Sequence, residues 1–260
     1  MAPSTSDHAF VVLGYESSPF LGECLASLSA QTTPSAILVV TSTPNPHIAK
    51  QAQLQGAPLE INPHRSGMAG DFNFALRASG ARFVTLVHQD DVYQPAFLTR
   101  TLDLFRRRPE GSLSFTGYHE IDDLGVVRRS KVSTGNDLLT AATLGRSQRV
   151  AGLRSRMFLG LGCAIPCSSV TYDMEKLAGF SFSTKLSCCM DWDAWWRLRQ
   201  DGHVFLRDRQ RLVHRRYNGQ TATAQAKRDG RRQSEDLAVL RKIWPSHIGD
   251  LVHRVYSLGY

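Results

Sequence analysis

Hydrophobic positions follow two different periods along the first 118 residues, and each period predicts its own kind of element. Short apolar runs predict buried strands at 10–13, 37–40, 59–61 and 83–87. Apolar residues spaced three or four positions apart predict helices that begin near residues 18, 68 and 95. Ser18 is expected to cap the first helix, with Pro19 at its first position, and Gly80 is expected to end the second. This order predicts an α/β fold with a mostly parallel sheet and helices on both of its faces.

The second half of the chain is less regular. The pattern predicts a strand at 113–118, a helix over 191–200 that ends at Gly202, a short strand at 204–206 and a closing helix near 237–244. Residues 119–160 are expected to form loops and short helices that the pattern does not place. No segment has the composition of a linker, so we expect a single domain.

Composition is that of a globular protein. The chain has 260 residues, of which 42% are hydrophobic and 21% are charged. No apolar run approaches the roughly 20 residues that a bilayer span needs, and the first residues do not resemble a signal peptide, so we expect a cytoplasmic location. The five cysteines lack a zinc-finger spacing and are expected to be free thiols in a reducing compartment.

Positive charge is concentrated late in the chain. The net charge is +8, and the stretch Arg197–Arg232 alone holds eleven Lys and Arg against three Asp. A basic face attracts nucleic acid, anionic lipid or phosphorylated substrates. The alternative is an ordinary solvated surface.

Two adjacent acids, Asp90 and Asp91, follow the strand predicted at 83–87. Ligands of open α/β sheets bind beyond the carboxyl ends of the strands, and an acid pair there suits Mg²⁺ or Mn²⁺ bound to a diphosphate. The alternative is a pair of loop acids that the dipole of the following helix stabilises.

Two further segments have the composition of a site. Asp191 and Asp193 stand among three tryptophans, where an apolar wall can raise the pKa of a carboxylate that acts as a general base. The alternative is a helix cap beside core tryptophans. Arg215 and Arg216 begin a polar segment that can bind phosphate oxygens.

Five segments, taken in chain order, resemble the family 2 glycosyltransferases. They are VVLGYE with ECLASLSAQT at 11–32, NPHRSGMAGDFN at 62–73, FVTLVHQDD at 83–91, MDWDAWWRL at 190–198 and RYNGQTAT at 216–223. The resemblance covers Val11 to about Trp244. It implies a GT-A (Rossmann-like) domain over 1–230, with a donor half at about 9–118 and an acceptor half at about 119–230. A helical extension packed on the domain is expected over 231–260.

The resemblance implies an inverting transfer of a sugar from a nucleoside diphosphate sugar to a hydroxyl of a saccharide, lipid-linked or other acceptor. Cell-surface polysaccharide or glycoconjugate synthesis is the expected setting. A peripheral contact with anionic membrane at the cytoplasmic face is expected, and no specific nucleic acid.

Site residues follow from the same resemblance. Asp191 is the expected catalytic base, Asp91 a ligand of Mg²⁺ or Mn²⁺, and Asp90 a ligand of the metal or the donor ribose. Tyr15 and Glu16 are expected to line the nucleoside pocket. The remaining expected contacts to the sugar nucleotide come from Gly14, Ser42, Arg65, Gly67 and, at the diphosphate, Arg216.

The sequence departs from the family pattern at four places. Thr41 and Ser42 stand where the family has two Asp after its second strand, His88 and Gln89 open the metal motif, Met190 replaces a Glu, and Asn218 replaces a late His. Two other classes of protein are alternatives. A nucleotidyltransferase would have a Gly-rich phosphate loop, which Gly14–Ser18 does not match, and a nucleic-acid module would show a recognised motif.

Overall fold

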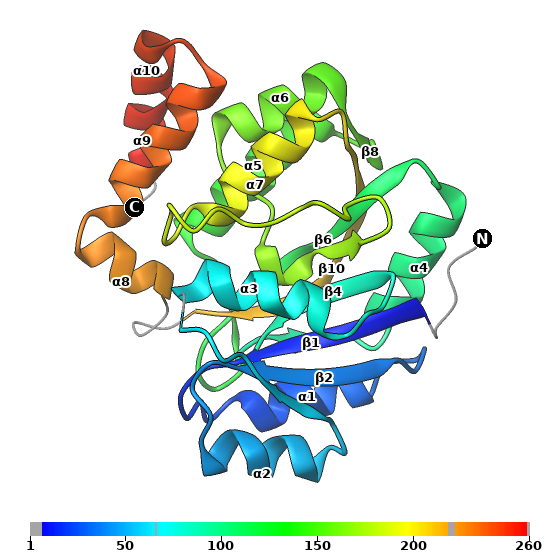
Figure 1. The fold of residues 1–260 in the computed structure, drawn as a ribbon. Coiled ribbons are helices and arrows are strands. Elements are labelled where there is room, and N and C mark those ends of the chain that lie inside the picture. The colour runs from blue at the N-terminus through cyan, green and yellow to red at the C-terminus, as the bar shows by residue number, and fades with distance from the viewer. Residues whose placement is uncertain (1–6, 66, 218–221, 259–260) are drawn as a thin grey trace.

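A ten-stranded mixed sheet forms the centre of the computed structural model, which describes residues 7–65, 67–217 and 222–258 (Figure 1). The main strand order is β3-β2-β1-β4-β9-β6-β10-β5, with β7 paired to β6 and β8 to β10. The strands are β1 (His8–Gly14), β2 (Ala36–Thr41), β3 (Leu59–Ile61), β4 (Phe83–His88), β5 (Val92–Tyr93), β6 (Gly111–Ile121), β7 (Val127–Arg128), β8 (Arg149–Val150), β9 (Thr171–Asp173) and β10 (Val204–Arg216).

The long strands run in one direction. β1 pairs in parallel with β2 and β4, β2 with β3, and β6 with β10. Strand β9 is antiparallel to both β4 and β6, so β6 and β10 keep the direction of β1. The carboxyl ends of six strands therefore meet at one edge of the sheet, and the predicted mostly parallel α/β arrangement is confirmed.

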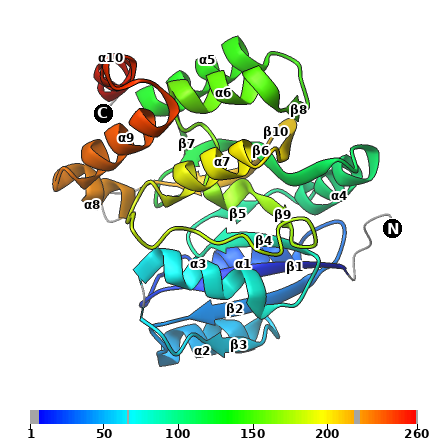
Figure 2. The ribbon, with the colours of Figure 1, turned by 45° about the horizontal axis from the view of Figure 1, so that its top comes forward.

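Helices cover both faces of the sheet (Figures 1 and 2). They are α1 (Leu21–Ser29), α2 (Pro46–Leu54), α3 (Gly67–Ala78), α4 (Phe97–Arg107), α5 (Lys131–Leu144), α6 (Gly152–Leu161), α7 (Met190–Gln200), α8 (Ala222–Arg228), α9 (Arg231–Ile243) and α10 (Ser246–Ser257). Side chains alternate along β1, so Phe10 and Val12 pack with α1, α2 and α4, whereas Ala9 and Val11 pack with α3, α6, α7 and α9. No helix in the described ranges is long and apolar enough to cross a bilayer.

Helix starts differ from the sequence-based expectation in two places. The first helix begins at Leu21, and the Ser18 hydroxyl accepts a hydrogen bond from the Phe20 amide at 3.3 Å instead of capping the helix. Helix α2 was not predicted, although Asn45 caps it by accepting from the Ile48 amide at 3.0 Å and Pro46 occupies its first turn. Its low share of apolar residues hid the helical period.

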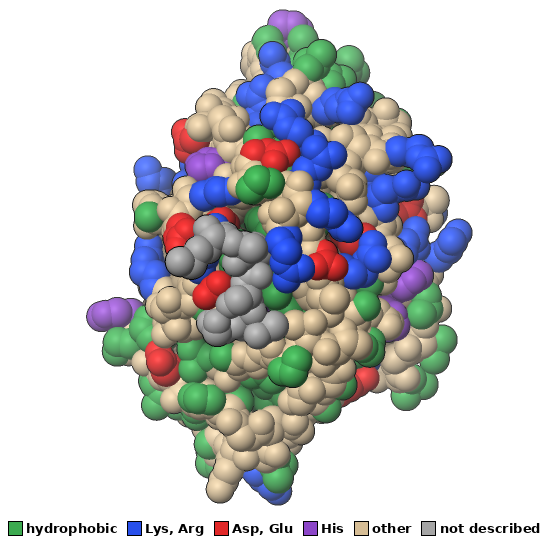
Figure 3. All heavy atoms as spheres, turned by 90° about the vertical axis from the view of Figure 1, so that its right-hand side faces the viewer, with side chains coloured by type: hydrophobic (Ala, Val, Ile, Leu, Met, Phe, Trp, Pro, Cys, Tyr) green, Lys and Arg blue, Asp and Glu red, His purple; other side chains and the backbone are tan. Residues whose placement is uncertain are grey.

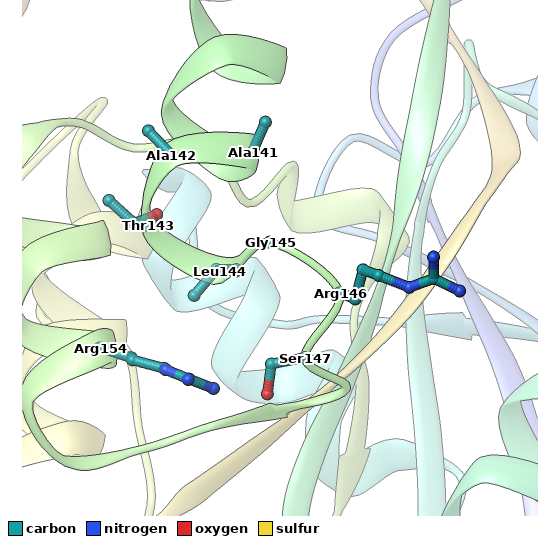
Figure 4. Close-up of a pocket in the computed structure, with 8 residues that line it drawn as sticks. All are labelled: Ala141, Ala142, Thr143, Leu144, Gly145, Arg146, Ser147 and Arg154. Carbon is teal, nitrogen blue, oxygen red and sulfur yellow. The ribbon is translucent and has the colours of Figure 1, made fainter.

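The region that the pattern did not place, 119–160, contains two full helices, α5 and α6. Half of the residues of α5 are exposed and only Leu144 is fully buried, so this helix lacks a wide apolar stripe. A surface depression lies where α5 ends, lined by 141–147 and Arg154 (Figure 4). It contains none of the expected site residues.

The basic stretch Arg197–Arg232 does not form one face. Strand β10 alone has 13 residues, which is roughly 43 Å of extended chain. At least five of the eleven cations form ion pairs with described residues, namely Arg197, Arg211, Arg216, Arg231 and Arg232. Lys and Arg side chains do gather on the face that Figure 3 shows, at the side of α4 and β8, away from the carboxyl ends of the strands.

The C-terminal helices hold the first turn of α7. The Glu235 carboxylate on α9 accepts hydrogen bonds from the amides of Ser187, Cys188 and Cys189, each at 2.9 Å. It also accepts from the Ser187 hydroxyl at 2.7 Å. Burial opposes its ionisation, but these donors outweigh burial and lower the pKa of Glu235 to about 2. A side chain of α9 thus serves as the cap that α7 lacks in its own sequence.

We expect Glu235→Gln to lower the free energy of unfolding by about 1 kcal/mol at pH 7, as loss of a helix cap does. The folded pKa lies below the ordinary value of 4.5, so the carboxylate stabilises the fold above pH 4.5 and loses this effect as pH falls toward 2. Urea denaturation across this range should show a smaller acid-dependent loss in Glu235→Gln than in the wild type. Equal acid dependence would contradict the capping role.

Candidate functional site

Most of the expected site residues converge at the carboxyl edge of the sheet. Gly14 ends β1, Ser42 follows β2, and Asp90 and Asp91 follow β4. Arg215 and Arg216 end β10, beside β6. Asp191 lies in the first turn of α7. The expected residues at 218–221 lie outside the described part of the chain.

A group of possible metal ligands follows β4. One ligand atom each from His88, Asp90 and Asp91 lie within 4.8 Å of one another. Asp91 is only 1% exposed, and its Oδ1 accepts a hydrogen bond from the Arg216 amide at 2.9 Å. Among the described residues its buried Oδ2 has no partner within hydrogen-bonding distance, although the Ser168 hydroxyl lies close enough to lower its pKa. A buried carboxylate oxygen of this kind beside a second acid fits a divalent cation.

Electrostatics support the same assignment. Burial, together with the charge of Asp90, raises the pKa of Asp91 to about 7. The Ser168 hydroxyl, the Arg215 charge and the Arg216 amide act in the opposite direction. These groups therefore offset only part of the cost of ionising Asp91. A bound cation would keep its carboxylate ionised. His88 is half-buried, and desolvation of its ring lowers its pKa, which favours the neutral imidazole.

Tyr15 and Glu16 form a fixed turn beyond β1. Gln89 accepts from the Tyr15 amide at 2.9 Å and donates to its carbonyl at 2.8 Å, so the turn is tied to the metal-ligand segment. Glu16 has a φ of +51°, and its amide donates to Thr43 Oγ1 at 2.8 Å. The Tyr15 side chain is 54% exposed and therefore open to a ligand. Aromatic rings that are held in this way are suited to stacking on a base.

The turn also brings together charges from two other elements. The negative charge of Glu16 raises the pKa of the Tyr15 hydroxyl, and Arg65 and Asp71 act on it as well. Asp71 on α3 accepts from the Ser42 hydroxyl and from the Asn62 amide, both at 2.8 Å. Gly67, another expected contact, begins α3 with a φ of +74°. Asp71 thus places a carboxylate next to Ser42, where the family pattern has its own acid.

Arg216 is built into the protein. It is 2% exposed, and its guanidinium donates to the carbonyls of Asp90 at 3.1 Å and Asp122 at 2.5 Å. It pairs with Glu23 at 2.6 Å and lies 4.1 Å from the centre of the Phe20 ring. The expected diphosphate contact from Arg216 would require these contacts to break. Its backbone and side chain hold the metal-ligand segment instead.

The adjacent Arg215 is partly exposed, unlike the buried Arg216. Its charge acts on Asp90, Asp91 and Asp191, and no hydrogen bond engages its guanidinium within the described ranges. Neighbouring residues of a strand point to opposite faces, so only one of the two arginines can face the ligand. The geometry favours Arg215 over Arg216 for a diphosphate.

Asp191 and Asp193 have different surroundings. Asp191 is half-buried, and its Oδ1 accepts from the Trp192 amide at 2.7 Å. Burial raises its pKa, and the charges of Arg232 and Arg215 partly offset this effect. Asp193 is buried and pairs with Arg197 at 2.9 Å and with Lys242 at 2.5 Å. Only Asp191 retains a carboxylate oxygen for an acceptor, which agrees with its expected role as a base.

Three residues of the site were not expected from the sequence: His88, Ser168 and Asp71. Arg215 was expected only as part of a polar segment that can bind phosphate, and Arg216 was the arginine chosen for the diphosphate. His88 lies inside the predicted metal motif and was treated only as a departure from it. Ser168 and Asp71 reach the site from a 3₁₀ turn (Cys167–Ser169) and from α3, and no local motif marks them. The alternation of side chains along β10 would have indicated Arg215, but register shifts between 204 and 213 interrupt that alternation, so the sequence does not show it.

The chain matches the protein-family model described as "Glycosyl transferase family 2" over residues 10–169, which is more than half of its length. No curated protein matches its sequence.

Solved structures with the same fold include three sugar-nucleotide complexes. S. aureus TarS 1–349 with UDP-GlcNAc has a TM-score of 0.64 and 14% identity, and the alignment covers 95% of this chain and 70% of that one. Pyrobaculum calidifontis mannosyltransferase PcManGT with GDP-Man and Mn²⁺ has a TM-score of 0.65 and 14% identity, with coverages of 91% and 63%. Mycobacterium tuberculosis glucosyl-3-phosphoglycerate synthase with Mn²⁺ and UDP-Glc has a TM-score of 0.61 and 16% identity, with coverages of 90% and 79%.

We expect Arg216→Ala to lower the free energy of unfolding by about 2–4 kcal/mol, because it leaves buried carbonyl groups without donors. Arg209→Ala, on an exposed part of the same strand, is the matched control and should change stability by less than about 0.5 kcal/mol. Urea denaturation followed by tryptophan fluorescence measures both. Equal stabilities of the two variants would show that Arg216 does not hold the site together.

Proposed function

The chain belongs to glycosyl transferase family 2, and on this premise we propose an inverting sugar transferase that uses a nucleoside diphosphate sugar. The acceptor is a hydroxyl of a saccharide, lipid-linked or other molecule, in cell-surface polysaccharide or glycoconjugate synthesis. One observation carries the proposal. The Arg215 charge acts on both the Asp90–Asp91 pair and Asp191, so a diphosphate site and a general base lie within reach of one cation.

On the donor side, Tyr15 and Glu16 bind the nucleoside, with Gly14, Ser42, Arg65 and Gly67 around it. Asp91 and Asp90 hold Mg²⁺ or Mn²⁺, and this ion, when bound, neutralises negative charge on the diphosphate. Arg215 adds a second positive charge where the leaving group gains negative charge. Arg216 fixes the backbone of Asp90 and Asp91 in place. The Mn²⁺ and sugar nucleotides in the PcManGT and glucosyl-3-phosphoglycerate synthase complexes support this assignment.

On the acceptor side, Asp191 takes the proton of the attacking hydroxyl. The hydroxyl oxygen attacks the anomeric carbon on the side opposite the diphosphate, so the configuration at that carbon inverts. Burial raises the pKa of Asp191, which makes its carboxylate a stronger base than an exposed one. Asp193 takes no part in this step because both of its carboxylate oxygens are engaged, one by Arg197 within α7 and the other by Lys242 of α9.

We expect Asp191→Asn to lower turnover at least about 100-fold, which is the lower range for loss of a general base. The affinity for the donor should stay nearly unchanged, because the base acts on the acceptor. In the wild type, turnover should fall on the acidic side at a higher pH than for an exposed aspartate, because the raised pKa brings protonation earlier.

The matched control is Asp193→Asn, which should act mainly on stability. Calorimetric titration with a panel of nucleoside diphosphate sugars plus Mn²⁺ identifies the donor. Turnover assays and urea denaturation then compare the two variants. If Asp193→Asn abolished turnover in a stable protein and Asp191→Asn only destabilised it, the roles would be reversed.

The proposal includes a peripheral contact with anionic lipid at the cytoplasmic face of a membrane. The net charge of +8 supports it, and the basic face in Figure 3, at the edge of the sheet away from the site, is the surface that would make the contact. We expect binding to vesicles that contain anionic lipid, at low salt only. Sedimentation with neutral vesicles is the control, and equal binding to both kinds or to neither would exclude the contact.

A further inference from the structure

His88 is the last residue of β4 and lies beside the two metal-site acids. Its ring centre is 5.6 Å from that of Phe72, and one of its nitrogens lies within 4.8 Å of the ligand oxygens of both Asp90 and Asp91. Its Nε2 is buried and has no hydrogen-bond partner in the described ranges. An unpartnered buried polar atom costs about 1–3 kcal/mol, so the fold retains it at a cost.

The buried His8 provides a comparison within the same sheet. Both of its nitrogens are satisfied, Nδ1 by the Ser35 hydroxyl at 2.8 Å and Nε2 by the Thr85 hydroxyl at 2.9 Å. The core therefore provides partners for a buried imidazole that has only a structural role. Among the described residues Nε2 of His88 lacks such a partner, and the ring lies instead beside the carboxylates of Asp90 and Asp91.

The spacing of the three ligand atoms suits one ion. Ligands on opposite sides of an ion at about 2.1 Å are about 4.2 Å apart, so the observed limit of 4.8 Å needs only a small contraction. The donor set is two carboxylates and one neutral imidazole. Mg²⁺ prefers oxygen ligands, whereas imidazole suits first-row transition ions.

We propose that His88 is a third protein ligand of the metal site and makes it select Mn²⁺ or a related transition ion over Mg²⁺. The inference rests on the proposed function only in assuming a cation site at Asp90 and Asp91. Paired acids alone give the site no preference between Mg²⁺ and Mn²⁺. His88 is the residue that creates a preference.

The first experiment uses the wild-type protein, stripped of metal with a chelator and then loaded with Mn²⁺ alone. Electron spin echo envelope modulation should detect a directly bound ¹⁴N, and labelling histidine with ¹⁵N should change the modulation. Calorimetric titration should give an affinity for Mn²⁺ at least about tenfold above that for Mg²⁺. Mn²⁺ bound without a nitrogen signal would overturn the proposal, as would equal affinities for the two ions.

The second experiment changes the ligand. His88→Asn should remove the nitrogen signal, and His88→Asp should reduce the Mn²⁺ to Mg²⁺ preference by at least about tenfold by supplying an oxygen ligand. His247→Asn, an exposed histidine on α10, is the matched control and should leave both unchanged. A nitrogen signal that persists in a folded His88→Asn variant would exclude His88. Circular dichroism checks the fold of each variant.

These measurements separate the inference from the proposed function. A nitrogen-ligated Mn²⁺ in a protein that binds no sugar nucleotide would support the role of His88 and contradict the transferase proposal. Sugar-nucleotide binding with Mn²⁺ coordinated only by oxygen would support the transferase proposal and contradict the role of His88.

Discussion

A buried carboxylate beside a second acid is the constraint on which the rest of the site depends. Asp91 is almost fully excluded from solvent next to Asp90, an arrangement that repels itself unless donors and cations compensate it. The compensation comes from residues about 125 positions later in the chain, where the Arg216 amide donates to Asp91 and its guanidinium holds the Asp90 carbonyl. Strand β10 must therefore end beside β4 for the acids to be tolerated, so the sheet topology and the site require each other.

The acceptor side depends on the C-terminal helices in a comparable way. Helix α7 has no cap within its own sequence, and Glu235 of α9 supplies one. Lys242 of α9 pairs with Asp193, and Arg232 pairs with Asp236 near the same turn. The family model ends at residue 169 and does not include Asp191. The place of Asp191 in the site is therefore argued from the packing of α7 and α9. The position of the proposed base is thus set by side chains of α9, and changes in that helix should affect the acceptor before they affect the donor.

The sequence predicted elements wherever packing on the sheet imposed a strong period. Strands β1, β2 and β4 are buried on both sides and appear as apolar runs, and α3 and α7 have clear apolar positions. Helices α2 and α5 were missed because tertiary position, not an apolar stripe, holds them. At the site, adjacent acids at a strand end were visible in the sequence. The sequence did not show which of Arg215 and Arg216 faces the ligand, because bulges interrupt the alternation of side chains along β10. It also did not mark Ser168 and Asp71, because both reach the site from distant elements.

Asp91 and Asp191 show how two carboxylates with raised pKa values can serve two tasks. Burial raises the pKa of both, but Asp90 adds a like charge beside Asp91, whereas Arg232 and Arg215 place positive charge beside Asp191. A carboxylate crowded by another acid gains most from a divalent cation, because the ion removes the repulsion as well as the desolvation cost. A carboxylate flanked by arginines stays ionised without a metal and still keeps the raised basicity that proton transfer needs. The neighbours of each acid, more than its burial, therefore assign one to the metal and the other to the acceptor proton.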